Sequence, residues 1–246
     1  MGLRLRVIMP PMNSQTLIRL SPLLLVGTSL AVPAGFKIQT YAGYPDVNYP
    51  TALSAAANGD VYVSSDPNGS LGHVKGYGKV IRCRDTNGDG KADQFKDFVP
   101  TLHSPRGGHF LRDTLYIIHP PYLSAFTDKD GDGVAEESKE LVKGFGWGIE
   151  HPRGADHTTN GVRMGIDGWL YVAVGDFGMP AAKGADGTVY TLFGGGVVRV
   201  RPDGSEMEPY ALYCRNICDV AISPTLDMFA RDNTNDGKGW NTRLHH

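Results

Sequence analysis

The sequence has few charged residues. Only 20% of its 246 residues are Asp, Glu, Lys or Arg, and the formal net charge is −2. No run of basic residues is longer than two, so the chain lacks the positive surface with which proteins bind nucleic acid backbones. The apolar share of 41% is nevertheless too high for a disordered chain. The composition therefore excludes nucleic acid as the main partner and indicates a globular protein.

Helical periodicity is also missing from most of the chain. After residue 34, no stretch keeps a 3.6-residue apolar period over three turns, whereas the sequence contains 32 glycines and 16 prolines. Short runs of β-branched and aromatic residues, broken by Asp-Gly, are typical of hairpins. The length fits one domain. We therefore expect an all-β fold with almost no helix.

A short apolar run lies near the N-terminus. Arg4, Arg6 and Arg19 are the only charges before Lys37, and the run Leu20–Ala34 ends in small residues. A basic N-terminal region, a short apolar segment and small residues at a cleavage site are typical of a secretory signal peptide. We therefore predict a signal peptide over residues 1–34, a mature protein in the periplasm or outside the cell, and no membrane span in the mature chain. A retained single-helix anchor is the alternative.

Cysteine is scarce, with three residues in the chain: Cys83, Cys214 and Cys218. An odd number leaves at least one thiol without an intramolecular partner. The spacing C-x-x-x-C differs from the C-x-x-C-H of haem attachment, and two such cysteines make no zinc site without further ligands. Two interpretations remain open, which are buried free cysteines and a Cys214–Cys218 disulfide.

One sequence pattern recurs along residues 35–246. A tight turn leads into a short strand with a central aromatic residue, and these aromatics follow one another at spacings of 54, 55 and 58 residues: Tyr62, Tyr116, Tyr171 and Phe229. Each repeat ends in a polar residue: Asp66, His119, Asp176 and Asp232. This period predicts the blades of a β-propeller. Four repeats fill the chain without a closing strand, so we expect an incomplete ring of about four blades, from a larger propeller, rather than a small closed ring.

Two acidic turns lie 43 residues apart, D-T-N-G-D-G-K-A-D and D-K-D-G-D-G-V-A-E. Oxygen ligands at positions 1, 3, 5 and 9, with Gly at position 6, suit a calcium ion. The candidate ligands are Asp85, Asn87, Asp89, Asp93, Asp128, Asp130, Asp132 and Glu136. Lys96 and Lys139 replace the position-12 Glu of an EF-hand. Solvated hairpins that bind no cation are the alternative.

The segment D-H-T-T-N-G-V-R-M-G-I-D-G-W-L-Y-V-A-V-G-D, residues 156–176, resembles the signature H-x-x-G-x-x-x-F-G-P-D-G-x-L-Y-V-x-x-G-D of the soluble quinoprotein glucose/sorbosone (aldose sugar) dehydrogenases. The steps from His157 to Asp167 and to Asp176 both match. The later C-R-N-I-C-D-V-A-I-S-P resembles the family's R-N-P-x-G-x-x-x-x-P. The ending R-D-N-T-N-D-G-K-G-W-N-T-R and the acidic turns resemble an exported, planctomycete-type subgroup that is often fused to cytochrome c.

The resemblance implies a six-bladed propeller that uses pyrroloquinoline quinone and calcium to oxidise a sugar or related polyol. His157 would be the general base for the sugar hydroxyl, with Asp176 orienting the imidazole. Arg215 would stabilise negative charge on the quinone, and Asn216 and Asn233 would contact the cofactor. A cytochrome c would be the electron acceptor. Imidazole and carboxylate chemistry independently suits these roles.

The sequence departs from the family at several positions. Asn160 and Gly161 stand where the family has Gly-Arg, and Ile166 replaces a proline. The loop 232–237 reads D-N-T-N-D-G where the family has a calcium-holding Glu-x-Gly, and the family's later basic residues fall beyond residue 246. The second hypothesis is therefore a non-catalytic, calcium-stabilised propeller that binds carbohydrate or a protein partner.

Overall fold

Short antiparallel strands make up the regular structure of the protein. The computed structural model describes residues 33–233 and 242–246, and these residues contain seventeen strands and no helix. Within these ranges, accordingly, there is no helix with the length and apolarity to cross a membrane. The chain divides into two units, Met1–Ile38 and Gln39–His246, and the fold given below is that of the second. The predicted signal peptide falls almost entirely on residues 1–32, outside the described part.

The first two sheets each begin with four strands that pair in sequence order. The first sheet has the order β1-β2-β3-β4, with β1 at Pro50–Ala55, β2 at Val61–Ser65, β3 at Gly78–Arg84 and β4 at Gln94–Leu102. The second has β5 at Gly107–Leu111, β6 at Thr114–His119, β7 at Tyr122–Thr127 and β8 at Glu137–Lys143. Each is therefore a simple antiparallel meander.

The third and fourth sheets follow the same plan. The third has the order β14-β13-β10-β9, with β9 at Thr159–Met164, β10 at Leu170–Val174, β13 at Gly195–Val200 and β14 at Glu208–Cys214. The fourth has β15 at Val220–Ile222, β16 at Met228–Asn233 and β17 at Thr242–His245. A further hairpin, β11 at Met179–Gly184 and β12 at Val189–Leu192, lies between β10 and β13 in the chain but pairs with β8, so the second sheet has six strands.

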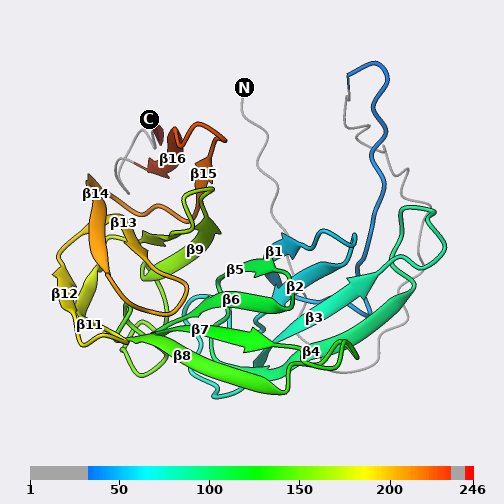
Figure 1. Ribbon diagram of the computed structural model, residues 1–246, viewed down its shortest axis with the longest axis horizontal. Helices are drawn as coiled ribbons and strands as arrows, with labels where there is room; N and C mark the ends of the chain where they lie inside the picture. The colour runs from blue at the N-terminus through cyan, green and yellow to red at the C-terminus, as the bar shows by residue number, and fades with distance from the viewer. Residues whose placement is uncertain (1–32, 234–241) are drawn as a thin grey trace, which may run out of the picture. The chain divides into compact units, whose positions relative to one another are not determined.

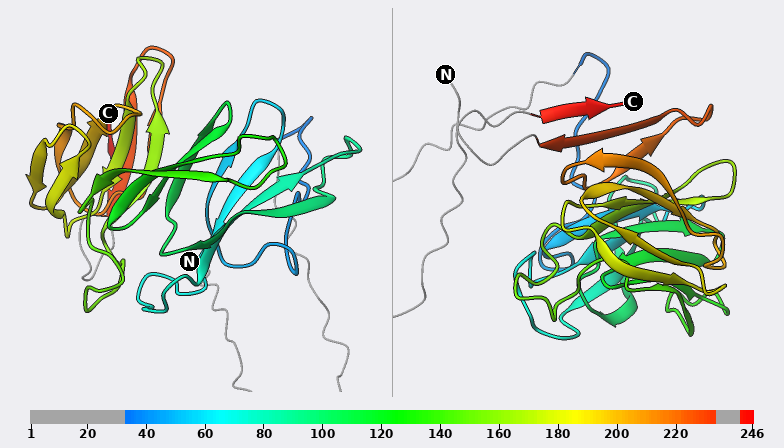
Figure 2. Two further views of the ribbon diagram at one scale, coloured as in Figure 1. Left: turned by 60° about the horizontal axis from the view of Figure 1, so that its bottom comes forward. Right: turned by 90° about the vertical axis from the view of Figure 1, so that its left-hand side faces the viewer.

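The four sheets are successive blades of a β-propeller, as the repeats predict. Their first strands, β1, β5, β9 and β15, contact one another in that order, and the blades follow an open arc (Figures 1 and 2). The four repeated aromatics all lie in the second strand of a blade: Tyr62 in β2, Tyr116 in β6, Tyr171 in β10 and Phe229 in β16. The all-β propeller prediction is therefore confirmed.

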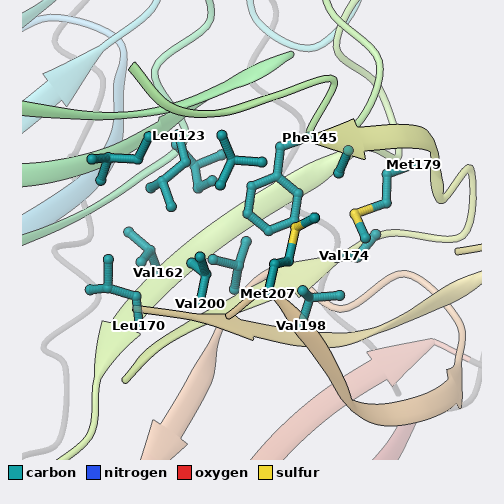
Figure 3. Close-up of a cluster of buried hydrophobic side chains, with 14 of the residues drawn as sticks. Leu123, Phe145, Val162, Leu170, Val174, Met179, Val198, Val200 and Met207 are labelled. Carbon is teal, nitrogen blue, oxygen red and sulfur yellow. The ribbon is translucent and has the colours of Figure 1, made fainter. Parts of the chain in front are cut away.

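Each pair of consecutive blades has a hydrophobic cluster of its own. Successive side chains of a strand point to opposite faces of the sheet. In β10, Leu170, Val172 and Val174 accordingly join the cluster shared with the second blade, which Figure 3 shows, whereas Tyr171 and Ala173 join the cluster shared with the fourth blade. A third cluster, around Tyr62, Phe98 and Leu115, lies between the first two blades. Both faces of the second and third blades are therefore buried between two clusters, which requires strands with apolar residues on both faces.

None of the three cysteines forms a disulfide within the described residues. Cys83 is buried, Cys214 is half-buried and Cys218 is exposed. Cys214 ends β14, whereas the carbonyl oxygen of Cys218 accepts a hydrogen bond from Gly161 N at 2.8 Å, close to β9. The free-cysteine interpretation therefore holds, but only Cys83 is fully buried.

Candidate functional site

The β9–β10 hairpin brings His157 and Asp176 together. Val174 pairs with Thr159, and beyond that pair Phe177 N donates to the carbonyl oxygen of His157 at 3.1 Å. Two antiparallel strands, β9 and β10, lie between the two residues, and the ends of a hairpin are adjacent without any further loop.

The imidazole and the carboxylate are in direct contact. His157 Nδ1 lies 2.6 Å from Asp176 Oδ1, and the side chains are 21% and 24% exposed. Since an ionised carboxylate only accepts hydrogen bonds, Nδ1 carries a proton, and in the neutral imidazole Nε2 then has the free lone pair. The ring of Phe177 lies against the imidazole, with 5.1 Å between centroids, and Asp156 Oδ1 is 3.8 Å from Nε2. This arrangement can accept a proton at Nε2 and stabilise the resulting charge.

Arg215 reaches the opposite side of the same carboxylate. Its Nη2 lies 3.6 Å from Asp176 Oδ2, and its backbone N donates to Asp232 Oδ2 at 2.7 Å. Arg215 follows β14, the outermost strand of the blade that carries His157 and Asp176, and residues 215–219 connect that strand to the next blade. Asp176 thus lies between an imidazole and a guanidinium.

Asn216 lies beside this group and lines a pocket of about 480 Å³. The pocket is bounded by Asn216, Cys218, Asp219, Arg231, Asp232 and Thr242. Asn216 Oδ1 is buried and has no hydrogen-bond partner within the described ranges. A Cβ on Gly175 would lie 2.7 Å from that oxygen and 2.4 Å from the carbonyl oxygen of His157, so only glycine fits here. The side chain of Asn233, the other predicted cofactor contact, lies outside the described residues.

The polar residues that end the repeats lie at equivalent places in the blades. Asp66, His119, Asp176 and Asp232 all lie within two residues of the end of the second strand of their blades. Burial tends to raise the pKa of Asp232, but hydrogen bonds from the Arg243 side chain and from the backbone N of Arg215 hold that pKa below its ordinary value. The acids at this rim are thus mostly matched by arginines.

Arg106, at the start of the second blade, is a rim residue that the sequence analysis missed. Its side chain is 12% exposed, and its Nη2 lies 3.7 Å from Oδ2 of Asp66, whose side chain is fully buried. Burial lowers the pKa of Arg106, and the nearby Asp66 and Asp156 oppose that effect. Burial also disfavours the charged form of Asp66, and this raises the pKa of that carboxyl group. The repeat position of Asp66 was visible in the sequence, but no local signal marks a single arginine as buried.

The two acidic turns have the same backbone arrangement. In the first, Asp85 accepts hydrogen bonds from Gly88 N and Gly90 N, and these amides, Gly90 first, lower its pKa. In the second, Asp128 accepts equivalent bonds from the amides at 131 and 133. Only the second turn gathers its carboxylates, with ligand atoms within 4.8 Å of one another: Asp128, Asp130, Asp132 and Glu136.

A lysine of the first blade lies at the edge of this second turn. Lys96 Nζ is 2.8 Å from Asp132 Oδ2 and 2.7 Å from the carbonyl oxygen of Asp132. This contact lowers the pKa of Asp132. An ammonium group therefore already neutralises part of the charge that a cation would bind.

The sequence matches, over residues 27–245, a family described as a domain of unknown function, DUF7133. No curated protein matches it. Among solved structures, a gluconolactonase of Xanthomonas campestris is 16% identical with a TM-score of 0.51, over 85% of this chain and 60% of its own. The PQQ-bound aldose sugar dehydrogenase of Streptomyces coelicolor is 20% identical with a TM-score of 0.51, over 77% of this chain and 58% of its own.

A luciferin-regenerating enzyme is similar to the same degree, with 12% identity, a TM-score of 0.51, and coverage of 79% of this chain and 60% of its own. The chain thus spans about 60% of the length of the solved structures that it matches. At such low identity the similarity supports the propeller fold and leaves the activity to be argued from the residues.

Proposed function

The chain belongs to the DUF7133 family, and we propose that it is part of an exported dehydrogenase that oxidises a sugar or related polyol. The single observation that carries this proposal is the contact of 2.6 Å between His157 Nδ1 and Asp176 Oδ1 at the rim of a propeller. A histidine held in this way, with its other nitrogen available, is suited to general base catalysis.

In this mechanism His157 Nε2 accepts the proton of the substrate hydroxyl group. The carbon that bears this hydroxyl group then loses its hydrogen. The electron pair of the carbon–hydrogen bond leaves with that hydrogen as hydride, and the carbon–oxygen bond becomes a carbonyl group. Asp176 fixes the tautomer of the imidazole and stabilises its protonated form. Arg215 balances the negative charge of the Asp176 carboxylate when the imidazole is neutral.

Pyrroloquinoline quinone would supply the hydride acceptor, and the residues fit one part of it. Arg215 and Asn216 would hold the group at the pocket beside the dyad, where the Asn216 Oδ1 atom needs a donor. Four arginines of the rim already face a carboxylate, in the pairs Arg106–Asp66, Arg153–Asp156, Arg215–Asp176 and Arg243–Asp232, whereas Arg231 lines the pocket itself. Among the described residues of the pocket, Arg231 would therefore be the cation available to a quinone carboxylate. A cytochrome c would then take the electrons.

We further propose that calcium binds at the acidic turns and stabilises the propeller. The gathered carboxylates of the second turn support this, since four oxygen ligands at such short range suit a hard cation. The same turns are the observation that favours the alternative function, a propeller that binds carbohydrate or a protein partner without catalysis. Export to the periplasm or the medium remains the prediction from the leader.

The experiment that tests the enzyme proposal measures sugar oxidation by the complete protein with quinone and calcium. We expect His157→Ala to lower kcat by about 100-fold or more, because a general base contributes that much, and to leave the melting temperature nearly unchanged. His109→Ala, which removes a histidine from the middle of β5, is the matched control and should retain activity. Absence of any quinone-dependent oxidation, or equal activity of His157→Ala, would support the binding-module alternative.

A further inference from the structure

Tyr213 is held in an unfavourable conformation and is almost fully exposed. Gly195 pairs with Cys214 while Gly196 pairs with Leu212, so Tyr213 is the extra residue of a β-bulge in β14. Its φ is +65°, in the left-handed region that favours glycine, and 91% of the residue is exposed. Bulges often redirect a side chain beside a functional site, and strain of this kind persists where the site uses it.

Phe193 is a second aromatic with the same exposure. It is 91% exposed, although the preceding Leu192 is buried, and it stands just before β13. A phenylalanine ring that faces water across nearly its whole surface contributes nothing to the core. Neither ring has an aromatic partner or a hydrogen bond within the described ranges, so folding gives no reason for either side chain.

Both rings lie at the end of the blade that carries the dyad. In the antiparallel order β9-β10-β13-β14, the start of β9, the end of β10, the start of β13 and the end of β14 share one edge. His157, Asp176, Phe193 and Tyr213 stand at these four places in turn. Adjacent strands are about 4.8 Å apart, so the row extends about 14 Å outward from His157.

We propose that Phe193 and Tyr213 are stacking platforms for a saccharide chain, so that the substrate of this site is the end of an oligosaccharide or polysaccharide. The proposal rests on the proposed function, since the dyad would act on the terminal sugar while the next sugars lie along the two rings. Aromatic faces carry partial negative charge and attract the polarised C–H faces of sugar rings, which are amphipathic like the aromatics themselves.

The binding experiment uses the complete protein with His157→Ala, so that no ligand is consumed. Glucose, maltotetraose and cellotetraose are titrated by calorimetry. We expect at least one tetraose to bind about 100-fold more tightly than glucose, and Phe193→Ala and Tyr213→Gly each to remove about tenfold of the tetraose affinity while glucose affinity is unchanged. Tyr44→Ala, an 87% exposed tyrosine ahead of the first blade, is the matched control and should change nothing.

Tyr213→Gly also separates a binding role from a structural one. Glycine adopts positive φ without strain, so this variant should keep or raise the melting temperature while it loses tetraose affinity. A lowered melting temperature with unchanged tetraose binding would overturn the proposal, and so would tetraoses that bind no more tightly than glucose.

Turnover of glucose by the wild-type protein distinguishes this inference from the proposed function. If glucose is oxidised but tetraoses gain no affinity, the stacking platforms are refuted and the dehydrogenase proposal stands. If tetraoses bind through both rings and no sugar is oxidised in the presence of quinone, the dehydrogenase proposal is refuted and the stacking platforms stand.

Discussion

His119 is a rim residue whose environment keeps it neutral. It is 7% exposed, and its Nε2 lies 2.8 Å from the hydroxyl oxygen of Ser124. Burial, with a smaller contribution from His103, lowers its pKa from 6.5 to about 4. Below pH 6.5 the unfolded chain therefore binds a proton at this residue that the folded protein rejects. The stability that neutral His119 contributes is present above pH 6.5 and is lost as the pH falls towards 4.

We expect this one residue to cost about 2 kcal/mol of unfolding free energy between pH 7.5 and pH 5. His119→Gln keeps a hydrogen-bonding group near Ser124 but does not titrate. Urea unfolding of both proteins at the two pH values measures the difference, and the wild type should lose about 2 kcal/mol more than the variant. Equal losses would mean that His119 is accessible to protons in the folded state.

At the residue scale, the sequence predicts contacts between residues that a single hairpin joins. The step from His157 to Asp176 spans one hairpin, and the family resemblance of this segment implied the contact that the structure has at 2.6 Å. Arg106 and Asp66 come from different blades, and their pairing depends on how those blades pack. When segments distant in the sequence bury a single side chain, the residues next to it in the sequence do not reveal that burial.

At the scale of elements, the Asp-Gly turns and the second-strand aromatics predict the hairpins well, because turn chemistry is local. The β11–β12 hairpin is different. It joins the second sheet through two residue pairs, Lys183 with Lys143 and Gly184 with Val142, across about 40 residues of chain. An edge strand can accept many partners, so sequence alone does not choose between them.

The acidic turns are elements whose proposed role is testable. We expect calcium to raise the melting temperature, because an ion that binds only the folded state stabilises it. The double variant Asp89→Ala with Asp132→Ala should abolish that rise. Asp203→Ala, in the turn of the β13–β14 hairpin, is the control and should leave it intact. An identical melting temperature with calcium and with chelator would identify both turns as solvated hairpins.

Lys96 refines this test. Its ammonium contacts Asp132 at 2.8 Å, so calcium at the second turn has to displace or tolerate it. Lys96→Met removes the charge and retains much of the apolar side chain. The calcium-induced rise in melting temperature should therefore be larger in this variant than in the wild type. A smaller rise would show that Lys96 supports the turn instead of competing with the ion.

At the scale of the whole molecule, blades depend on one another because their apolar residues lie between them. A strand with a 3.4 Å rise per residue and alternating faces buries both faces only when a blade packs on each side. The three clusters contain Leu115, Leu123 and Ile217, each no more than 1% exposed. No inner blade can unfold alone without exposing two clusters to water, which links the free energies of neighbouring blades.

We therefore expect the blades of Gln39–His246 to unfold in one transition, and a cavity in any cluster to shift that whole transition. Leu115→Ala, Leu123→Ala and Ile217→Ala, one in each cluster, should each cost about 2–5 kcal/mol. Circular dichroism and the fluorescence of tryptophans, among them Trp147 and Trp169, are two independent probes of unfolding. Within each variant, the two probes should give the same urea midpoint as each other. Ile166→Ala, at a residue that is 76% exposed in the β9–β10 turn, should stay within about 0.5 kcal/mol of the wild type. Separate midpoints for the two probes in Ile217→Ala alone would show that the fourth blade unfolds independently, and that its cluster with the third blade is too weak to couple them.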